Sequence, residues 1–137
     1  FGIIIAHWPD IPDRIPTHFN AAGEPDGYGG KKTLWFLAAM NVFVYVVTTL
    51  TARYPRLINV PFEIDRNSPD VQRVALRMTT VIKAVLMALF VYIVWMIVQT
   101  AIGNASGLGR RFLPVFLVAV FAPVVFYSVK LWKLRVR

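Results

Sequence analysis

The sequence predicts an all-α protein, a polytopic transmembrane helix bundle, from its composition and from three long apolar segments. Hydrophobic residues make up 57% of the 137 positions and charged residues only 16%, whereas soluble domains carry about 25% charged residues. The apolar segments cover residues 33–52, 80–102 and 112–132. About 20 helical residues cross a bilayer core, and a backbone in hydrocarbon must satisfy its own hydrogen bonds. Each segment is therefore predicted to be a transmembrane helix.

The chain begins with a shorter apolar stretch, residues 1–6, with no polar residue before it. We interpret this stretch as the end of a first helix whose beginning is missing from the sequence. Residues 1–137 then form a single membrane domain, with three full helices and the end of a truncated first one. Segments 7–32 and 53–79 are predicted to be the longer loops between these helices.

The positions of Lys and Arg predict the orientation of the chain. Ten of them lie in or next to segment 53–79 and the C-terminal end, against five on the other side of the spans. Because cytoplasmic loops carry an excess of Lys and Arg, segment 53–79 and the C-terminus are predicted to be cytoplasmic, and segment 7–32 lies outside. We expect an integral protein of a bacterial inner (plasma) membrane. Its net charge of +8 indicates contact with anionic lipid rather than with nucleic acid.

Few polar residues interrupt the predicted spans, and Asn41 is the deepest of them. An interhelical hydrogen bond is the simpler interpretation of such a residue, and a ligand contact is the alternative. The spans contain no Asp or Glu. This argues against a transporter coupled to protons or cations, because such transporters use carboxylates within the membrane.

Segment 7–32 differs from the rest of the chain. Its four prolines and four glycines exclude a continuous helix, and its aromatic and aliphatic residues are too many for a free linker. We predict a rigid loop that lies on the outer membrane interface. Both histidines of the chain, His7 and His18, are in this segment, together with four carboxylates.

The chemistry of this loop favours binding over catalysis. His and carboxylate side chains bind zinc or manganese, but the spacing around His18 fits no metal motif, so we predict that His18 is hydrogen-bonded to a turn and holds the loop. No nucleophile and base lie within reach of each other in the sequence, so we assign no catalytic and no metal-binding residue. His7 directly follows the apolar start, a position that also suits axial ligation of a chlorophyll-type pigment or a haem.

The loop carries a motif that resembles the signature of a membrane family called domain of unknown function 1648. The pattern is Pro-x-x-Ile-Pro-x-His-Phe/Trp-Asn-x-x-Gly-x-x-Asp-x-aromatic, followed by Lys. Its residues in this sequence are Pro12, Ile15, Pro16, His18, Phe19, Asn20, Gly23, Asp26, Tyr28 and Lys31. The resemblance implies that His18, Asn20, Gly23, Asp26 and Lys31 organise the loop or bind through it.

Members of this family include the SdpI-type proteins, which give immunity to a secreted toxin. Their additional C-terminal half and its motif have no counterpart here. We therefore expect a non-catalytic binding, accessory or immunity-type protein, without a resident cofactor, that contacts lipid and a membrane or extracytoplasmic protein. Two alternatives stay open: an auxiliary transmembrane subunit of a redox or photosynthetic complex that contacts pigment, haem or quinone, and a metal-dependent membrane enzyme that uses His18.

Overall fold

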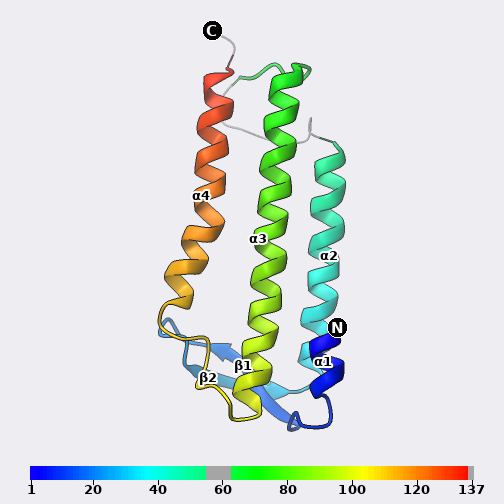
Figure 1. Cartoon of the computed structure of the whole chain (residues 1–137), viewed down its shortest axis with the longest axis vertical. Coiled ribbons are helices and arrows are strands. Elements are labelled where there is room, and N and C mark those ends of the chain that lie inside the picture. Colours follow the sequence, from blue (N-terminus) through cyan, green and yellow to red (C-terminus); the bar gives the residue numbers. More distant parts are fainter. Residues whose placement is uncertain (55–62, 136–137) are drawn as a thin grey trace. The chain divides into compact units, whose positions relative to one another are not determined.

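The structure, a computed structural model, describes residues 1–54 and 63–135. Its elements, labelled in Figure 1, are α1 (Gly2–His7), β1 (Arg14–Phe19), β2 (Pro25–Gly30), α2 (Thr33–Arg53), α3 (Pro69–Ala101) and α4 (Phe112–Lys133). The helices α2, α3 and α4 are each long and apolar enough to cross a membrane. The predicted class, a helical protein with three spans, is therefore confirmed.

The helix α3 is longer than the apolar segment from which it was predicted. It begins at Pro69 rather than at residue 80, so the last part of segment 53–79 is helical, while residues 55–62 of that segment lie outside the described residues. Pro69 takes the first helical position, where its missing N–H costs nothing, and Asp70 lies in the first turn, where a negative charge is favourable. Arg73 and Arg77 lie before the apolar segment that begins at residue 80. They interrupt the hydrophobic pattern, but Arg is a good helix former, so the helix includes them.

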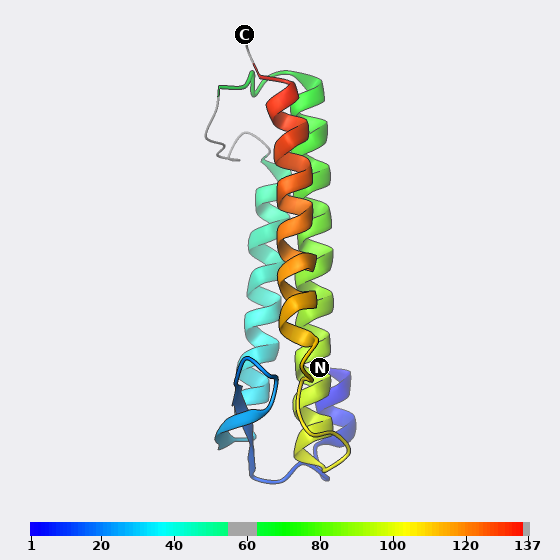
Figure 2. The same ribbon diagram turned by 90° about the vertical axis from the view of Figure 1, so that its left-hand side faces the viewer.

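The described chain forms two compact units. The first comprises residues 1–42 and 88–117, and the second comprises the described parts of 43–87 and 118–137. The first unit contains α1, both strands, the N-terminal half of α2 and the C-terminal end of α3. Within it, α1 runs alongside the C-terminal end of α3 (Figure 2).

The predicted rigid loop is in part an antiparallel β-hairpin. Arg14 pairs with Gly30 and Ile15 with Gly29, and the register becomes irregular at His18. The sequence does not predict these strands, because proline and glycine are depleted in strands and the second strand reads Pro-Asp-Gly-Tyr-Gly-Gly. We use "the hairpin" below for residues 14–30.

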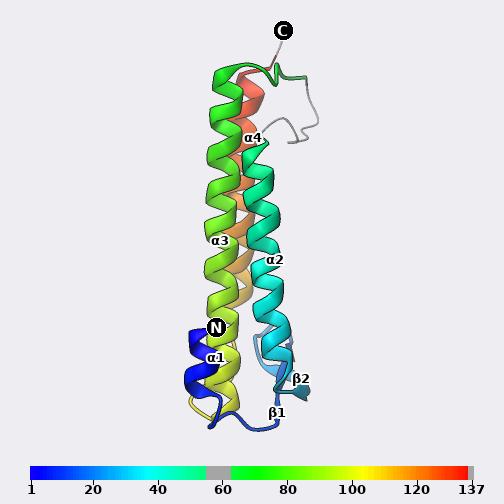
Figure 3. The ribbon, with the colours of Figure 1, turned by 90° about the vertical axis from the view of Figure 1, so that its right-hand side faces the viewer.

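A hydrophobic core attaches the hairpin to the helices of the first unit. Its buried residues are Ile4, Ile11, Ile15, Leu34, Ala38, Val94, Ile97 and Val98. Ile11 and Ile15, which precede and begin the hairpin, are only 2% and 1% exposed. Burying such a side chain contributes about 1.5–3 kcal/mol, so apolar packing in this core anchors the hairpin. Figure 3 shows the hairpin beside the N-terminal end of α2.

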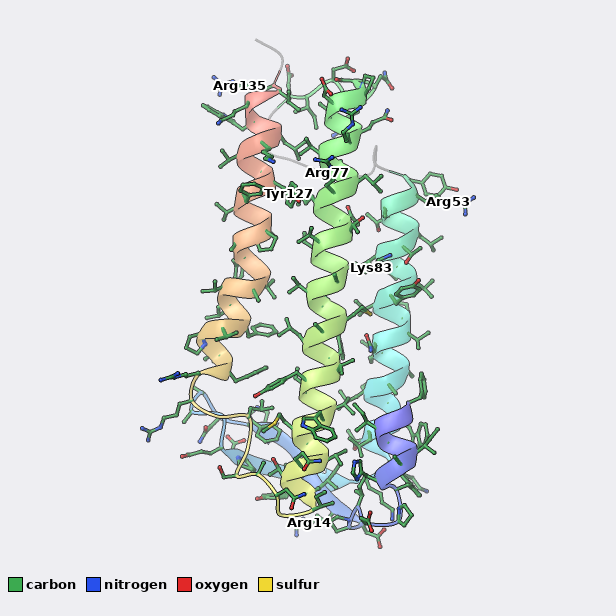
Figure 4. The ribbon with its side chains drawn as sticks, in the orientation of Figure 1. Arg14, Arg53, Arg77, Lys83, Tyr127 and Arg135 are labelled. Carbon is green, nitrogen blue, oxygen red and sulfur yellow. The ribbon has the colours of Figure 1, made fainter. Side chains whose placement is uncertain are left out.

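The second unit places one charged side chain between two helices. Lys83 extends from α3 toward α2 (Figure 4), where its Nζ donates a hydrogen bond to the Thr49 hydroxyl at 3.3 Å. The same ammonium lies 5.0 Å from the centre of the Tyr45 ring. A hydroxyl acceptor and an aromatic face therefore partly replace water around this cation.

Candidate functional site

The turn of the hairpin is organised by Asn20. Its side-chain oxygen accepts hydrogen bonds from the backbone N–H groups of Ala22, at 2.9 Å, and of Glu24, at 3.0 Å. Its side-chain nitrogen donates to the Glu24 carboxylate at 3.2 Å. The backbone N–H of Asn20 also donates to the carbonyl of Glu24. Asn side chains favour turns because they can hydrogen-bond nearby backbone in this way.

Gly23 connects this turn to a second one. We use "the docking turn" for residues 103–109, which link α3 to α4. The carbonyl of Gly23 accepts a hydrogen bond from the N–H of Leu108 at 2.8 Å. Gly23 has φ +75, and a Cβ placed on it would lie 2.5 Å from the carbonyl oxygen of Gly109. Only glycine permits both this conformation and this approach of two backbones.

The docking turn is itself fixed to α3. The sequence indicates a turn here, but its contact with the hairpin was not predicted. The Tyr92 hydroxyl donates a hydrogen bond to the Leu108 carbonyl at 3.1 Å, and a Cβ at Gly107 would overlap the carbonyl oxygen of Gly23. Gly107 and Leu108 are buried although they lie in a short glycine-rich turn. The cluster of glycines in the turn was the available signal, because glycine marks places where backbones approach closely.

Lys31 holds the other end of the hairpin. Its backbone N–H donates to the carbonyl of Asp13 at 2.9 Å, and its ammonium lies 3.1 Å from the Asp13 carboxylate. The same ammonium donates to the carbonyl of Ile11 at 3.4 Å and lies 5.1 Å from the centre of the Trp8 ring. One side chain thus joins the segment that enters the hairpin to the segment that leaves it.

His18 and Asp26 form a pair near the tip of the hairpin. The Nδ1 atom of His18 is hydrogen-bonded to the Asp26 carboxylate, and the two side chains are 73% and 42% exposed. The hydrogen-bond partner of His18 is thus a side chain on the facing strand β2, and not a turn as predicted from the sequence. The five predicted loop residues therefore occupy three places: this pair, the turn of Asn20 and Gly23, and Lys31 at the base.

A cation and an aromatic ring are presented on the same hairpin. The Arg14 guanidinium lies 5.7 Å from the centre of the Tyr28 ring, and the two residues line a surface depression. Tyr28 is 54% exposed. Arg14, His18, Asp26 and Tyr28 are all exposed, so the hairpin presents polar and aromatic groups on its surface, while Ile15 is buried in the core with the helices.

The remaining sequence candidates lie elsewhere in the first unit. His7 is the last residue of α1 and packs edge-on against Trp95, with 5.9 Å between ring centres. In residues 1–54 and 63–135, no group of three or more His, Cys, Asp or Glu side chains is placed to hold a metal ion. For Asn41, the favoured interhelical hydrogen bond is absent among these same residues, because its side-chain oxygen is buried without a partner.

Comparisons with known proteins agree with the motif in the hairpin. The model of a family described as domain of unknown function (DUF1648) matches residues 1–42. An uncharacterized protein of Archaeoglobus fulgidus is 37% identical over 62 residues, a match that covers 39% of this chain and 34% of that protein. No solved structure matches the chain. The segment that matches the DUF1648 family model, residues 1–42, thus contains α1, the hairpin and the first half of α2.

Proposed function

We propose that the chain is a non-catalytic membrane protein, of the accessory or immunity type, that recognises a protein partner through the hairpin. The supporting observation is that the hairpin is fixed at both ends while four of its polar and aromatic side chains stay exposed. Asn20, Gly23 and Lys31 supply the attachment. A surface that is already ordered loses less conformational entropy on binding than a mobile loop does.

The exposed side chains suit a protein or peptide partner. Tyr and Arg are enriched among the residues that dominate binding energy in protein interfaces, and here Arg14 and Tyr28 lie against each other. His18 and Asp26 add a hydrogen-bonding pair close to the turn. On the orientation predicted from Lys and Arg, this surface faces away from the cytoplasm, so its partner is a membrane or extracytoplasmic protein.

A photo-crosslinking experiment tests this function. Tyr28 is replaced by p-benzoylphenylalanine in the full-length protein, and living cells are irradiated. We expect an adduct of one discrete mass that disappears when Arg14→Ala is added. The matched control carries the crosslinker at Asn104, an exposed residue of the docking turn. The same products from both positions would contradict recognition by the hairpin.

An immunity function predicts a second observable effect, the protection of cells from a toxin. Cells that express the protein should survive exposure to secreted toxin from the source organism better than cells without it. Protection should decrease with the same substitutions that remove the adduct at Tyr28. If the adduct forms but the cells are not protected from the toxin, the immunity function is excluded and the accessory function is retained.

A second candidate role rests on His7. This imidazole is half-buried at the end of α1 and lies edge-on to Trp95, an aromatic setting in which an auxiliary subunit of a redox or photosynthetic complex could hold a pigment or haem. The test is the visible absorption of the protein purified gently from its native membrane. Absorbance that is lost in His7→Ala would favour this role, and a colourless protein would remove it.

A further inference from the structure

Arg14 of the hairpin has no negatively charged partner in this chain. It is exposed, and no carboxylate of residues 1–54 and 63–135 forms an ion pair with its guanidinium. The residues outside this part of the chain contain no Asp or Glu. Because the guanidinium of arginine is always charged in proteins, this charge remains available to a group from another molecule.

Most of the carboxylates near Arg14 in the sequence are bound by other residues. Three of them form contacts within segment 7–32, in the pairs Asp13–Lys31, Glu24–Asn20 and Asp26–His18. Asp10, the fourth carboxylate of this segment, forms no ion pair with Arg14 among the described residues. The folded hairpin therefore leaves Arg14 without a counter-charge, although it binds both of its own acids.

Tyr28 holds the guanidinium of Arg14 without occupying its hydrogen-bond donors. The guanidinium carbon lies 5.7 Å from the centre of the ring, and the two residues line a surface depression of about 380 Å³. A cation–π contact is made by the charge and leaves the N–H groups free to donate to a ligand. It also restricts the long side chain before binding, which lowers the entropy that a ligand contact would cost. Arg14 is thus a preformed anion-binding group.

A carboxylate is the anion that suits this arrangement. The flat fork of N–H donors on arginine matches a carboxylate, which accepts two parallel hydrogen bonds from it. The ring of Tyr28 offers an aromatic surface to the hydrocarbon part of the same ligand residue. On the proposed function the ligand is a protein, and carboxylates are the groups that carry negative charge in unmodified proteins at neutral pH. We therefore propose, on the basis of that function, that the partner presents a carboxylate to Arg14, from an Asp or Glu side chain or from its C-terminus.

Charge variants of Arg14 test the proposal in the full-length protein. Each variant is combined with p-benzoylphenylalanine at the position of Tyr28, and the discrete adduct is measured in irradiated cells. Arg14→Gln should reduce the adduct about tenfold, the effect of losing one hydrogen-bonded charge pair. Arg14→Lys keeps the charge and should retain more adduct than Arg14→Gln, whereas Arg14→Glu should retain the least because like charges repel. An unchanged adduct in Arg14→Gln, or a yield in Arg14→Lys no higher than in Arg14→Gln, would overturn the proposal.

A reaction with a water-soluble carbodiimide identifies the anion. This reagent couples an amine to a carboxylate in contact with it, but it does not couple a guanidinium. In the Arg14→Lys variant with Tyr28 intact, we expect a new product with the same partner. Mass spectrometry should place the new bond between position 14 and an Asp, a Glu or the C-terminus of that partner. The matched control, Arg110→Lys, changes another exposed arginine of the first unit and should give no such product.

The outcomes separate this proposal from the function on which it rests. If no adduct forms while Arg14 is intact, the proposed function itself is contradicted. If the adduct forms but the carbodiimide makes no bond at position 14, or makes an equivalent bond in Arg110→Lys, the carboxylate contact of Arg14 is excluded and the function remains. Coupling of position 14 to a phospholipid would also overturn the proposal and would assign the anion to the bilayer.

Discussion

The carbonyl oxygen of Gly23 and the backbone N–H of Leu108 form a hydrogen bond of 2.8 Å that joins the hairpin to the docking turn. The two residues are far apart in sequence, yet their backbones touch because glycines surround the contact on both sides. This contact fixes the tip of the hairpin, and Lys31 fixes its base. The exposed residues between them are thereby held in one arrangement.

Gly23→Ala should release the tip of the hairpin. An alanine there has an unfavourable positive φ, at a cost of about 1–3 kcal/mol, and its Cβ meets the carbonyl of Gly109. We expect faster hydrogen exchange of residues 20–26 in liposomes, with unchanged exchange in the spans. Gly30→Ala is the matched control, because a Cβ at Gly30 meets nothing within 4 Å. Equal exchange in both variants would contradict the docking contact.

Asn20→Ala should loosen the turn without detaching it from the docking turn. The change removes three side-chain hydrogen bonds, with an expected loss of about 1–2 kcal/mol in local stability. Hydrogen exchange of the Ala22 and Glu24 amides should increase. Asn20→Asp keeps the accepting oxygen and should show a smaller increase. If both variants exchange like the unsubstituted protein, Asn20 does not organise the turn.

Lys31→Met should weaken the base of the hairpin, whereas Lys32→Met should not. The ammonium of Lys31 contacts the Asp13 carboxylate, the Ile11 carbonyl and the Trp8 ring, and we expect a loss of about 1 kcal/mol. Lys32 is the exposed neighbour with the same charge. Protease cleavage between residues 9 and 14 in intact liposomes measures the difference. Equal cleavage in the two variants would contradict the role given to Lys31.

His18→Ala should affect binding more than stability. Its pair with Asp26 is exposed, and exposed pairs contribute less than about 1 kcal/mol. We therefore expect hydrogen exchange of the hairpin to stay nearly unchanged, while the adduct formed through position 28 decreases. Asp26→Asn is a second variant that removes the charge and keeps the shape. A collapse of hairpin protection in His18→Ala would instead make this residue a structural one.

The sequence predicted the elements that depend on local composition. The spans α2 and α4 follow from hydropathy alone, since each is apolar over most of its length and carries basic residues only in its last turn. The first turns of α3 were missed because Arg73 and Arg77 make this part of the helix too polar to be recognised by hydropathy. The strands were missed because β2 has little intrinsic strand preference and forms only by pairing with β1.

The sequence predicted which residues form the candidate site, but it did not predict which atoms they contact. The motif pointed to His18, Asn20, Gly23, Asp26 and Lys31, and all five lie in or beside the hairpin. Their partners could not be read from the sequence, because Leu108 and Gly109 are distant along the chain and meet Gly23 only in the folded protein. The hydrogen bond expected for Asn41 could not be judged from the sequence either, because it requires a polar side chain of a neighbouring helix within reach. In the described residues the side-chain oxygen of Asn41 has no such partner.

The match to the family model ends at residue 42, but the hydrophobic core around this segment extends beyond it. Val94, Ile97 and Val98 of α3 complete that core, and Leu108 supplies the hydrogen bond to the tip. The matched segment is thus smaller than the compact unit in which it lies, and residues 1–42 are not a portable module. Moving them onto another protein would require a host helix that offers the same apolar stripe and a glycine turn at its end.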